Sequence, residues 1–256
     1  MKSFLGRIAR SLARKTGGTI THVSTSDPVV ALTFDDGPDP VTTPELLRIL
    51  DAFGAKATFF MTGENAAAYP EVVAAVRKGG HAIGNHSWDH PSFPLISGSE
   101  RRRQIRRTAD ELQSAGARVF RPPYGHQTAA SRWDAWFAGH KVVTWNVCVP
   151  DWEDHDGAWL ADFALGRIKA GSVVLMHDGM VDFSGEHGSD RGATLVAVEK
   201  ILTALGGEYE FVTIPELLLR GKPVKAKWRM APDVAFLNRL NRRNGTPRRY
   251  KIPANP

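Results

Sequence analysis

The chain of 256 residues is long enough to bury a full hydrophobic core, and its 42% hydrophobic and 23% charged residues are an ordinary globular composition. A single cysteine, Cys148, excludes an internal disulfide framework, and no run of about 18 apolar residues is present to span a membrane. The formal net charge of +6 comes from basic residues at the two ends, which excludes a basic nucleic-acid-binding surface spread over the domain. We therefore expect one cytoplasmic domain with no nucleic-acid partner.

The N-terminal segment is basic and amphipathic. Residues 1–16 carry a charge of +5, with Phe4, Leu5, Ile8 and Leu12 at helical spacing. Such a segment either lies on an anionic bilayer or is a solvated basic end, and its apolar run is too interrupted for a secretory signal. Residues 220–256 carry +10, which leaves −9 on residues 17–219. Two basic ends on an acidic body predict peripheral docking at the inner membrane face.

Between the ends, short β-rich apolar runs alternate with stretches of helical periodicity, a pattern typical of parallel β/α units. The strands are predicted at residues 29–34, 56–61, 81–84, 118–121, 141–147, 172–177 and 209–213. The helices are predicted at residues 44–53, 66–78, 99–115, 128–138, 157–169 and 193–205.

Seven parallel strands with outer helices favour an α/β fold of the distorted (β/α) barrel type, although an open doubly wound sheet has the same local pattern. In both architectures the site residues follow the carboxyl ends of strands. The polar clusters obey this rule, because DDG, NHSWDH, RPPYG, PDW and HD follow the first, third, fourth, fifth and sixth predicted strands. The sequence therefore predicts one site at the carboxyl edge of the sheet.

Asp35 and Asp36 end an otherwise apolar strand, and His86 and His90 are four residues apart after another strand. Adjacent acids alone are often a solvated turn or a helix cap, and a lone H-x-x-x-H pair is weak evidence. Together they indicate a metal site, since two histidines and one carboxylate leave positions open for water and substrate. Adjacent strand residues face opposite ways, so the two acids are expected to have different tasks.

Three further strand ends carry polar residues. Arg121 precedes the rigid segment Pro122–Pro123, which can hold its guanidinium bidentate against a carboxylate. Asp151 with Trp152 and His177 with Asp178 end the fifth and sixth strands, and a satisfied core histidine remains the alternative for His177.

The motifs TFDDG at 33–37, HSxxH at 86–90, RPPY at 121–124, DW at 151–152 and LxH at 175–177 occur in this order. The chain thereby resembles the polysaccharide deacetylases of carbohydrate esterase family 4, with the NodB homology domain, over roughly residues 28–220. The resemblance implies a distorted (β/α) barrel and metal-dependent hydrolysis of N-acetyl groups on aminosugars. It also divides the chain into a basic N-terminal segment (1–27), a catalytic domain (28–220) and a basic C-terminal extension (221–256).

The resemblance further implies a role for each matching residue. Asp36, His86 and His90 would hold a divalent ion, most simply Zn²⁺ with Co²⁺ as an alternative. Asp35 would be the general base for the metal-activated water, oriented by Arg121. The Tyr124 amide would stabilise the oxyanion, and His177, tuned by Asp151, would protonate the leaving amine. Trp152 and Leu175 would enclose the acetyl methyl group.

Cys148 departs from the family pattern, which commonly has an acid there, and we interpret it as a small hydrophobic residue. The predicted partner is an N-acetylated saccharide, soluble or lipid-linked. Two alternatives remain: a catalytically silent carbohydrate-binding protein, and a hydrolase of O-acetyl esters or other amides. The sequence does not predict the oligomeric state.

Overall fold

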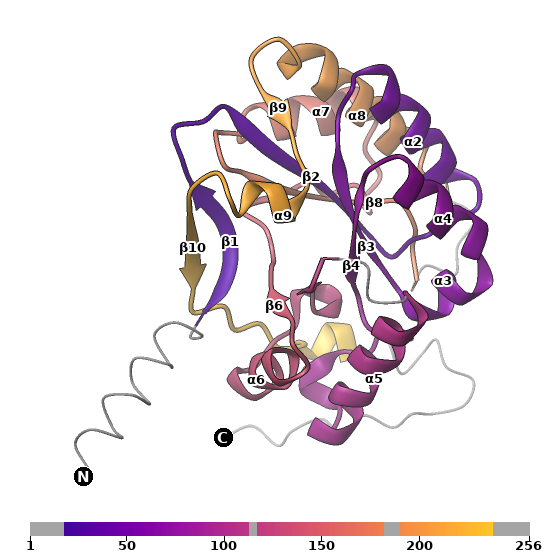
Figure 1. Ribbon diagram of the computed structural model, residues 1–256, viewed down its shortest axis with the longest axis vertical. Helices are drawn as coiled ribbons and strands as arrows, with labels where there is room; N and C mark the ends of the chain where they lie inside the picture. The colour runs from indigo at the N-terminus through magenta and orange to yellow at the C-terminus, as the bar shows by residue number, and fades with distance from the viewer. Residues whose placement is uncertain (1–17, 113–116, 182–189, 238–256) are drawn as a thin grey trace.

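The computed structural model describes residues 18–112, 117–181 and 190–237 (Figure 1). Its main sheet has eight strands, of which seven form the path β6-β5-β4-β3-β2-β8-β7 while β9 pairs with β2. All of these pairings are parallel. The strands are β2 (Val29–Asp35), β3 (Ala57–Met61), β4 (Ala82–Asn85), β5 (Val119–Phe120), β6 (Lys141–Val142), β7 (Val147–Cys148), β8 (Val173–His177) and β9 (Glu210–Phe211).

The two edges of this path, β6 and β7, are separated by only four residues, 143–146. Five residue steps span at most about 18 Å, so the sheet must curl until its edges approach each other. The curled parallel sheet confirms the predicted distorted barrel over the open alternative. The prediction of one strand over 141–147 was wrong. There the Thr144 amide donates to the Ile20 carbonyl and the Asn146 amide to Val173, so the chain crosses between the edges.

The helices cover the outside of the curl, with α2, α4, α7 and α8 along one side in Figure 1. The predicted helix at 66–78 is two helices, because Pro70 cannot donate a backbone hydrogen bond and starts a new helix at its first position. The helix predicted to reach residue 169 ends before Gly166. The elements are α2 (Thr42–Ala52), α3 (Gly63–Ala68), α4 (Pro70–Lys78), α5 (Gly98–Glu111), α6 (Ala129–Phe137), α7 (Gly157–Leu165), α8 (Gly192–Leu205), α9 (Ile214–Leu217) and the 3₁₀ turns η1 (Phe93–Leu95) and η2 (Pro123–Gly125).

The sequence did not predict the second sheet, in which β1 (Thr19–Ser24) pairs antiparallel with β10 (Lys222–Ala226). Residue 20 of β1 also forms a parallel bridge with Val143, beside the gap between the main-sheet edges. Both strands lie in the segments assigned to the two ends of the chain, and the division at residues 27 and 221 stays a prediction. No helix in the described ranges is long and apolar enough to cross a bilayer.

The core has two faces, and β2 separates them. Val30, Leu32 and Phe34 belong to the apolar cluster under the outer helices, whereas Val29 and Ala31 belong to the cluster inside the curl. Successive strand residues alternate between faces, so Thr33 and Asp35 continue the inner face. Asp35 is therefore carried to the inner, carboxyl end of the sheet, where the other polar clusters gather.

Candidate metal centre and active site

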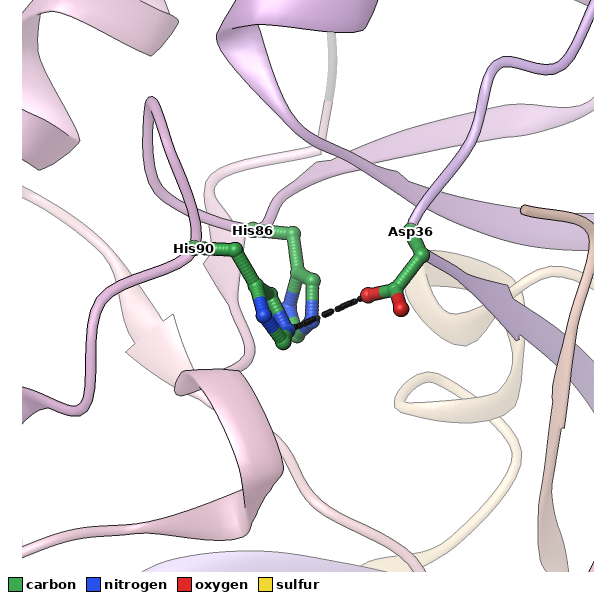
Figure 2. A group of neighbouring side chains, drawn as sticks. All are labelled: Asp36, His86 and His90. Atoms are coloured by element: carbon green, nitrogen blue, oxygen red, sulfur yellow. Dashed lines mark hydrogen bonds and ion pairs between the residues drawn. The ribbon is translucent and has the colours of Figure 1, made fainter. Parts of the chain in front are cut away.

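Asp36, His86 and His90 lie together at this end of the sheet, and their side chains point toward one another (Figure 2). Asp36 directly follows β2, His86 directly follows β4, and His90 lies in the same loop as His86. The Asp36 Oδ1 atom is 3.3 Å from His86 Nε2 and 3.1 Å from His90 Nε2, and the two Nε2 atoms are 3.2 Å apart. All three residues are buried.

This triangle fits a divalent metal ion. Donors placed 2.0–2.1 Å from a tetrahedral ion lie about 3.3 Å from one another, close to the three separations found here. The His86 ring donates from Nδ1 to the Arg121 carbonyl at 2.8 Å, which turns the lone pair of Nε2 toward the triangle. Burial acts to raise the pKa of Asp36, but His90 and His86 outweigh it and hold the pKa well below its usual value.

Four residues in or beside the triad have a left-handed backbone conformation. Asp36, Ser87, His90 and Tyr124 have positive φ angles, between 55° and 74°, and they are the only non-glycine residues of the described ranges that do. This left-handed conformation is costly for most side chains and persists where the surrounding structure enforces it. The HSxxH segment is accordingly a tight bend rather than a helix.

Asp35 lies beside the triad but is held by a different partner. Its Oδ1 atom accepts a hydrogen bond of 2.7 Å from Arg121 Nη1, and its Oδ2 atom is 3.8 Å from His86 Nε2. The pair is monodentate, not bidentate as predicted, because the remaining guanidinium donors bind elsewhere. Arg121 Nη2 donates to the Thr144 carbonyl, Nε to Val143 and Nη1 also to Thr33 Oγ1.

Arg121 is fully buried and its guanidinium lies over the Phe60 ring, 4.0 Å from the centroid. Burial lowers the pKa of Arg121, and the charge of Asp35 opposes that effect. The four donated bonds use four of the five N–H donors of the guanidinium and fix its position. One Asp35 oxygen is thereby locked while the other faces the triad.

His177 and Asp151 form a second pair, in which Asp151 is buried and the His177 side chain is 14% exposed. His177 Nδ1 donates to Asp151 Oδ1 at 2.8 Å, which leaves Nε2 as the outward ring nitrogen. Burial lowers the pKa of His177, but the charge and hydrogen bond of Asp151 outweigh it and raise the pKa to about 9. The ring is therefore protonated at neutral pH, unlike a neutral core histidine.

The other predicted site residues lie at the same edge. Leu175 is buried and, two residues before His177 in β8, shares its face of the strand. The Trp152 ring meets the His177 ring edge-on at 5.5 Å. The Tyr124 ring packs on His90 with centroids 4.4 Å apart. The structure thus brings all ten predicted residues to one end of the sheet.

Comparison with known proteins identifies the family. The polysaccharide deacetylase family model matches residues 22–143. A peptidoglycan-N-acetylglucosamine deacetylase from Bacillus cereus is 34% identical over 216 residues, which cover 82% of this chain and 98% of that protein. The chain belongs to the polysaccharide deacetylase family.

A chitooligosaccharide deacetylase from Sinorhizobium fredii is 31% identical over 73% of this chain and 90% of its own length. Among solved structures, BA3943 from Bacillus anthracis, described as a family 4 pseudoenzyme, superposes with a TM-score of 0.70 at 25% identity, covering 80% of this chain and 70% of that chain. A pseudoenzyme thus shares the polysaccharide deacetylase fold. The fold alone therefore does not indicate catalysis, which depends on the side chains of the site.

Several supporting residues of this deacetylase site were not predicted from the sequence. Gln104 of α5 accepts hydrogen bonds from the amides of Trp88 and Asp89, and Asn85 accepts one from Ser87. These bonds hold the bend between His86 and His90. Gln104 lies 14 residues beyond His90 in a helix, and no local signal in the sequence connects it to the metal loop.

Asp151 is also supported from α8, since Thr194 Oγ1 donates to its Oδ2 atom at 3.0 Å and Arg191 Nη1 donates to its carbonyl. Cys148 occupies the position where family members commonly have an acid. Burial raises the pKa of the Cys148 thiol to about 12, with the charges of Asp151 and Asp35 adding to the effect. The thiol is therefore neutral and unreactive at neutral pH.

Proposed function

We propose that the protein is a metal-dependent hydrolase that removes the N-acetyl group from an aminosugar of an oligosaccharide, a polysaccharide or a glycan precursor. The observation that carries this proposal is the metal-binding geometry of Asp36, His86 and His90 together with two separate proton-transfer groups, Asp35 and His177. A protein that only binds carbohydrate needs the triad at most. The Arg121–Asp35 and Asp151–His177 pairs add the separate proton acceptor and proton donor that hydrolysis requires.

Amide hydrolysis needs an activated water, stabilisation of the tetrahedral oxyanion and a proton for the leaving nitrogen. A divalent ion at the triad supplies Lewis acidity and lowers the pKa of a water from 15.7 toward about 7. Asp35 accepts the proton of the attacking water at Oδ2, because Oδ1 is occupied by Arg121. The hydrogen bond from Arg121 thereby holds Asp35 with its Oδ2 atom facing the triad.

The other two requirements fall to Tyr124 and His177. The Tyr124 amide, in its left-handed turn beside His90, donates to the oxyanion, a contribution of about 3 kcal/mol for one such donor. His177, protonated through Asp151, donates the proton to the nitrogen. Trp152 and Leu175 enclose the acetyl methyl group next to His177.

We expect the Asp151→Asn variant to lose activity in the alkaline range first. His177 has a raised pKa and acts as an acid, so it is active below about pH 9 and loses its proton as the pH rises through that value. Without the Asp151 charge and hydrogen bond, burial lowers this pKa from about 9, while the charges of Asp36 and Asp35 still act to raise it, so the alkaline limb of the activity profile moves to lower pH. Profiles of kcat/KM between pH 6 and 10 test this, and an alkaline limb at the same pH in both proteins contradicts it.

Zn²⁺ is the ion we propose, because two imidazoles and one carboxylate at tetrahedral spacing are its usual catalytic ligands, and Co²⁺ accepts the same set. Metal content can be measured on the purified protein. The chelated protein is then reloaded with Zn²⁺, Co²⁺ or Mg²⁺, and we expect Zn²⁺ and Co²⁺ to restore activity while Mg²⁺ does not.

The function is tested by acetate release from N-acetylated monosaccharides, nucleotide sugars, lipid-linked sugars, chitooligosaccharides and peptidoglycan fragments. O-acetylated xylan is included to separate an esterase from an N-deacetylase. Release from an N-acetyl substrate that is abolished by Asp35→Asn supports the proposal. Saccharide binding without release across the panel supports the silent binding protein instead.

We also propose a cytoplasmic location with peripheral contact at the inner membrane face. The support is a single cysteine and the basic residues of the two ends, five in residues 1–16 and six in residues 238–256. Vesicles of phosphatidylglycerol and phosphatidylcholine should sediment the full chain more strongly than a variant without these two stretches. Residues 222–237 are retained in that variant because they pack on the domain. Equal sedimentation of both proteins contradicts membrane contact.

A further inference from the structure

The chain continues beyond β10 along the turn that carries Tyr124. We name residues 227–237 the clamp segment. Its Met230 forms a two-bond antiparallel bridge with Gln127: the Gln127 amide donates to the Met230 carbonyl at 2.7 Å, and the Met230 amide donates back at 3.2 Å. Gln127 Nε2 also donates to the Trp228 carbonyl at 3.2 Å. In the view of Figure 1 the yellow helical turn of this segment is drawn between α5 and α6.

Trp228 binds the turn that contains Tyr124 and Gly125. Its Nε1 atom donates to the Gly125 carbonyl at 2.8 Å, and its ring packs edge-on against Trp145 at 5.2 Å. Gly125 has φ = 68°, and a Cβ atom there would lie 2.8 Å from the Trp145 ring. A side chain at residue 125 would therefore clash with Trp145, and the hydrogen bond from Trp228 holds the Gly125 carbonyl.

Phe236 is the outermost ring in a series of packed aromatic side chains that starts at His90 and continues through Tyr124. Its ring centroid is 4.7 Å from that of Tyr124 and 4.8 Å from that of His126, and the Tyr124 ring packs in turn on His90. The Asp233 side chain accepts from the Phe236 amide and the neighbouring Leu237 is buried, so the ring is anchored. Phe236 and Tyr124 are only partly buried, which leaves aromatic surface beside the site.

We propose that the clamp segment is part of the substrate cleft, with Phe236 as a specificity-determining residue and Trp228 as a positioning residue. The proposal rests on the deacetylase function proposed above. Phe236 lies one ring beyond Tyr124, so it packs against the apolar C–H face of the sugar unit adjoining the one that is deacetylated. Trp228 acts through the Tyr124 turn, whose amide faces the oxyanion. The site therefore prefers oligosaccharides to monosaccharides.

The test measures kcat and KM for tri-N-acetylchitotriose and for N-acetylglucosamine. Phe236→Ala should raise KM for the trisaccharide about tenfold, change KM for the monosaccharide less than about twofold, and be rescued by Phe236→Trp. Trp228→Phe keeps an aromatic ring at this position but removes the Nε1 donor to Gly125, and should lower kcat with KM little changed. Phe137→Ala, an aromatic residue of α6 that is 68% exposed, is the matched control.

Titration calorimetry with tri-N-acetylchitotriose separates this proposal from the proposed function, because binding needs no turnover. Binding by the wild type that weakens about tenfold in Phe236→Ala supports the cleft role even if no acetate is released. Equal affinity of wild type and Phe236→Ala overturns it, as does a wild type that neither binds nor hydrolyses the trisaccharide. A Phe236→Ala variant that impairs both substrates equally also overturns the assignment to the adjoining sugar unit.

Discussion

The Asp35→Asn variant is expected to bind metal about as tightly as the wild type while kcat falls about 10²–10⁴-fold, the usual contribution of a general base. The reason is the division of labour between the two adjacent acids. Asp36 Oδ1 is within 3.3 Å of both histidine nitrogens, whereas Asp35 approaches only His86, at 3.8 Å, and is held by Arg121. Asparagine keeps an oxygen for Arg121 but cannot accept the proton of water.

The same substitution leaves the charge of Arg121 without its counterion in a fully buried position. Removing one partner of a buried ion pair typically costs about 3–5 kcal/mol of folding stability. Circular dichroism and thermal unfolding should therefore accompany the kinetics, with Asp162→Asn on the exposed face of α7 as a control for the chemical change. A folded Asp35→Asn protein that binds metal and retains activity would exclude Asp35 as the base.

The fold was predictable where one strand or helix carries a repeating pattern. The strand β2 is apolar from Val29 to Phe34 except for Thr33, and it ends at Asp35 with Asp36 directly after it, so its position and its role at the site follow from local sequence. The break between β6 and β7 was not predictable, because Val143, Thr144 and Trp145 are as strand-like as their neighbours. Only the bonds of Thr144 to Ile20 and of Asn146 to Val173, both made at long range, divide that segment.

In the candidate site, too, the residues in short sequence motifs were predictable, whereas the residues that support them from other elements were not. The metal triad, Asp35 and His177 stand in short motifs at strand ends, where residue type and spacing indicate their chemistry. Gln104, Thr194 and Trp228 act only by binding a motif residue from another element. A glutamine in a helix or a tryptophan near a basic C-terminus has many ordinary uses, and nothing in the adjacent sequence distinguishes these.

The Asp36→Asn variant is expected to lose both metal and activity. Asparagine tolerates the left-handed backbone of this position, φ = 74°, as well as aspartate does, so the substitution removes the charge without new strain. The triad then offers two neutral nitrogens and one amide oxygen, and the charge that Asp36 holds at neutral pH through its low pKa is gone. We expect metal affinity to fall more than about 100-fold, beyond the 10–100-fold seen when only a supporting residue of a metal site is changed.

Metal titration of the chelated Asp35→Asn and Asp36→Asn proteins side by side decides the assignment of the two acids. If Asp36→Asn binds metal like the wild type and Asp35→Asn does not, the two roles are exchanged. If both variants lose metal, both acids act as ligands and the base must be sought elsewhere. The structure favours neither of these outcomes. The ligand atoms of Asp36, His86 and His90 form a closed triangle with sides of 3.1 to 3.3 Å. Asp35 lies outside this triangle and is hydrogen-bonded to Arg121.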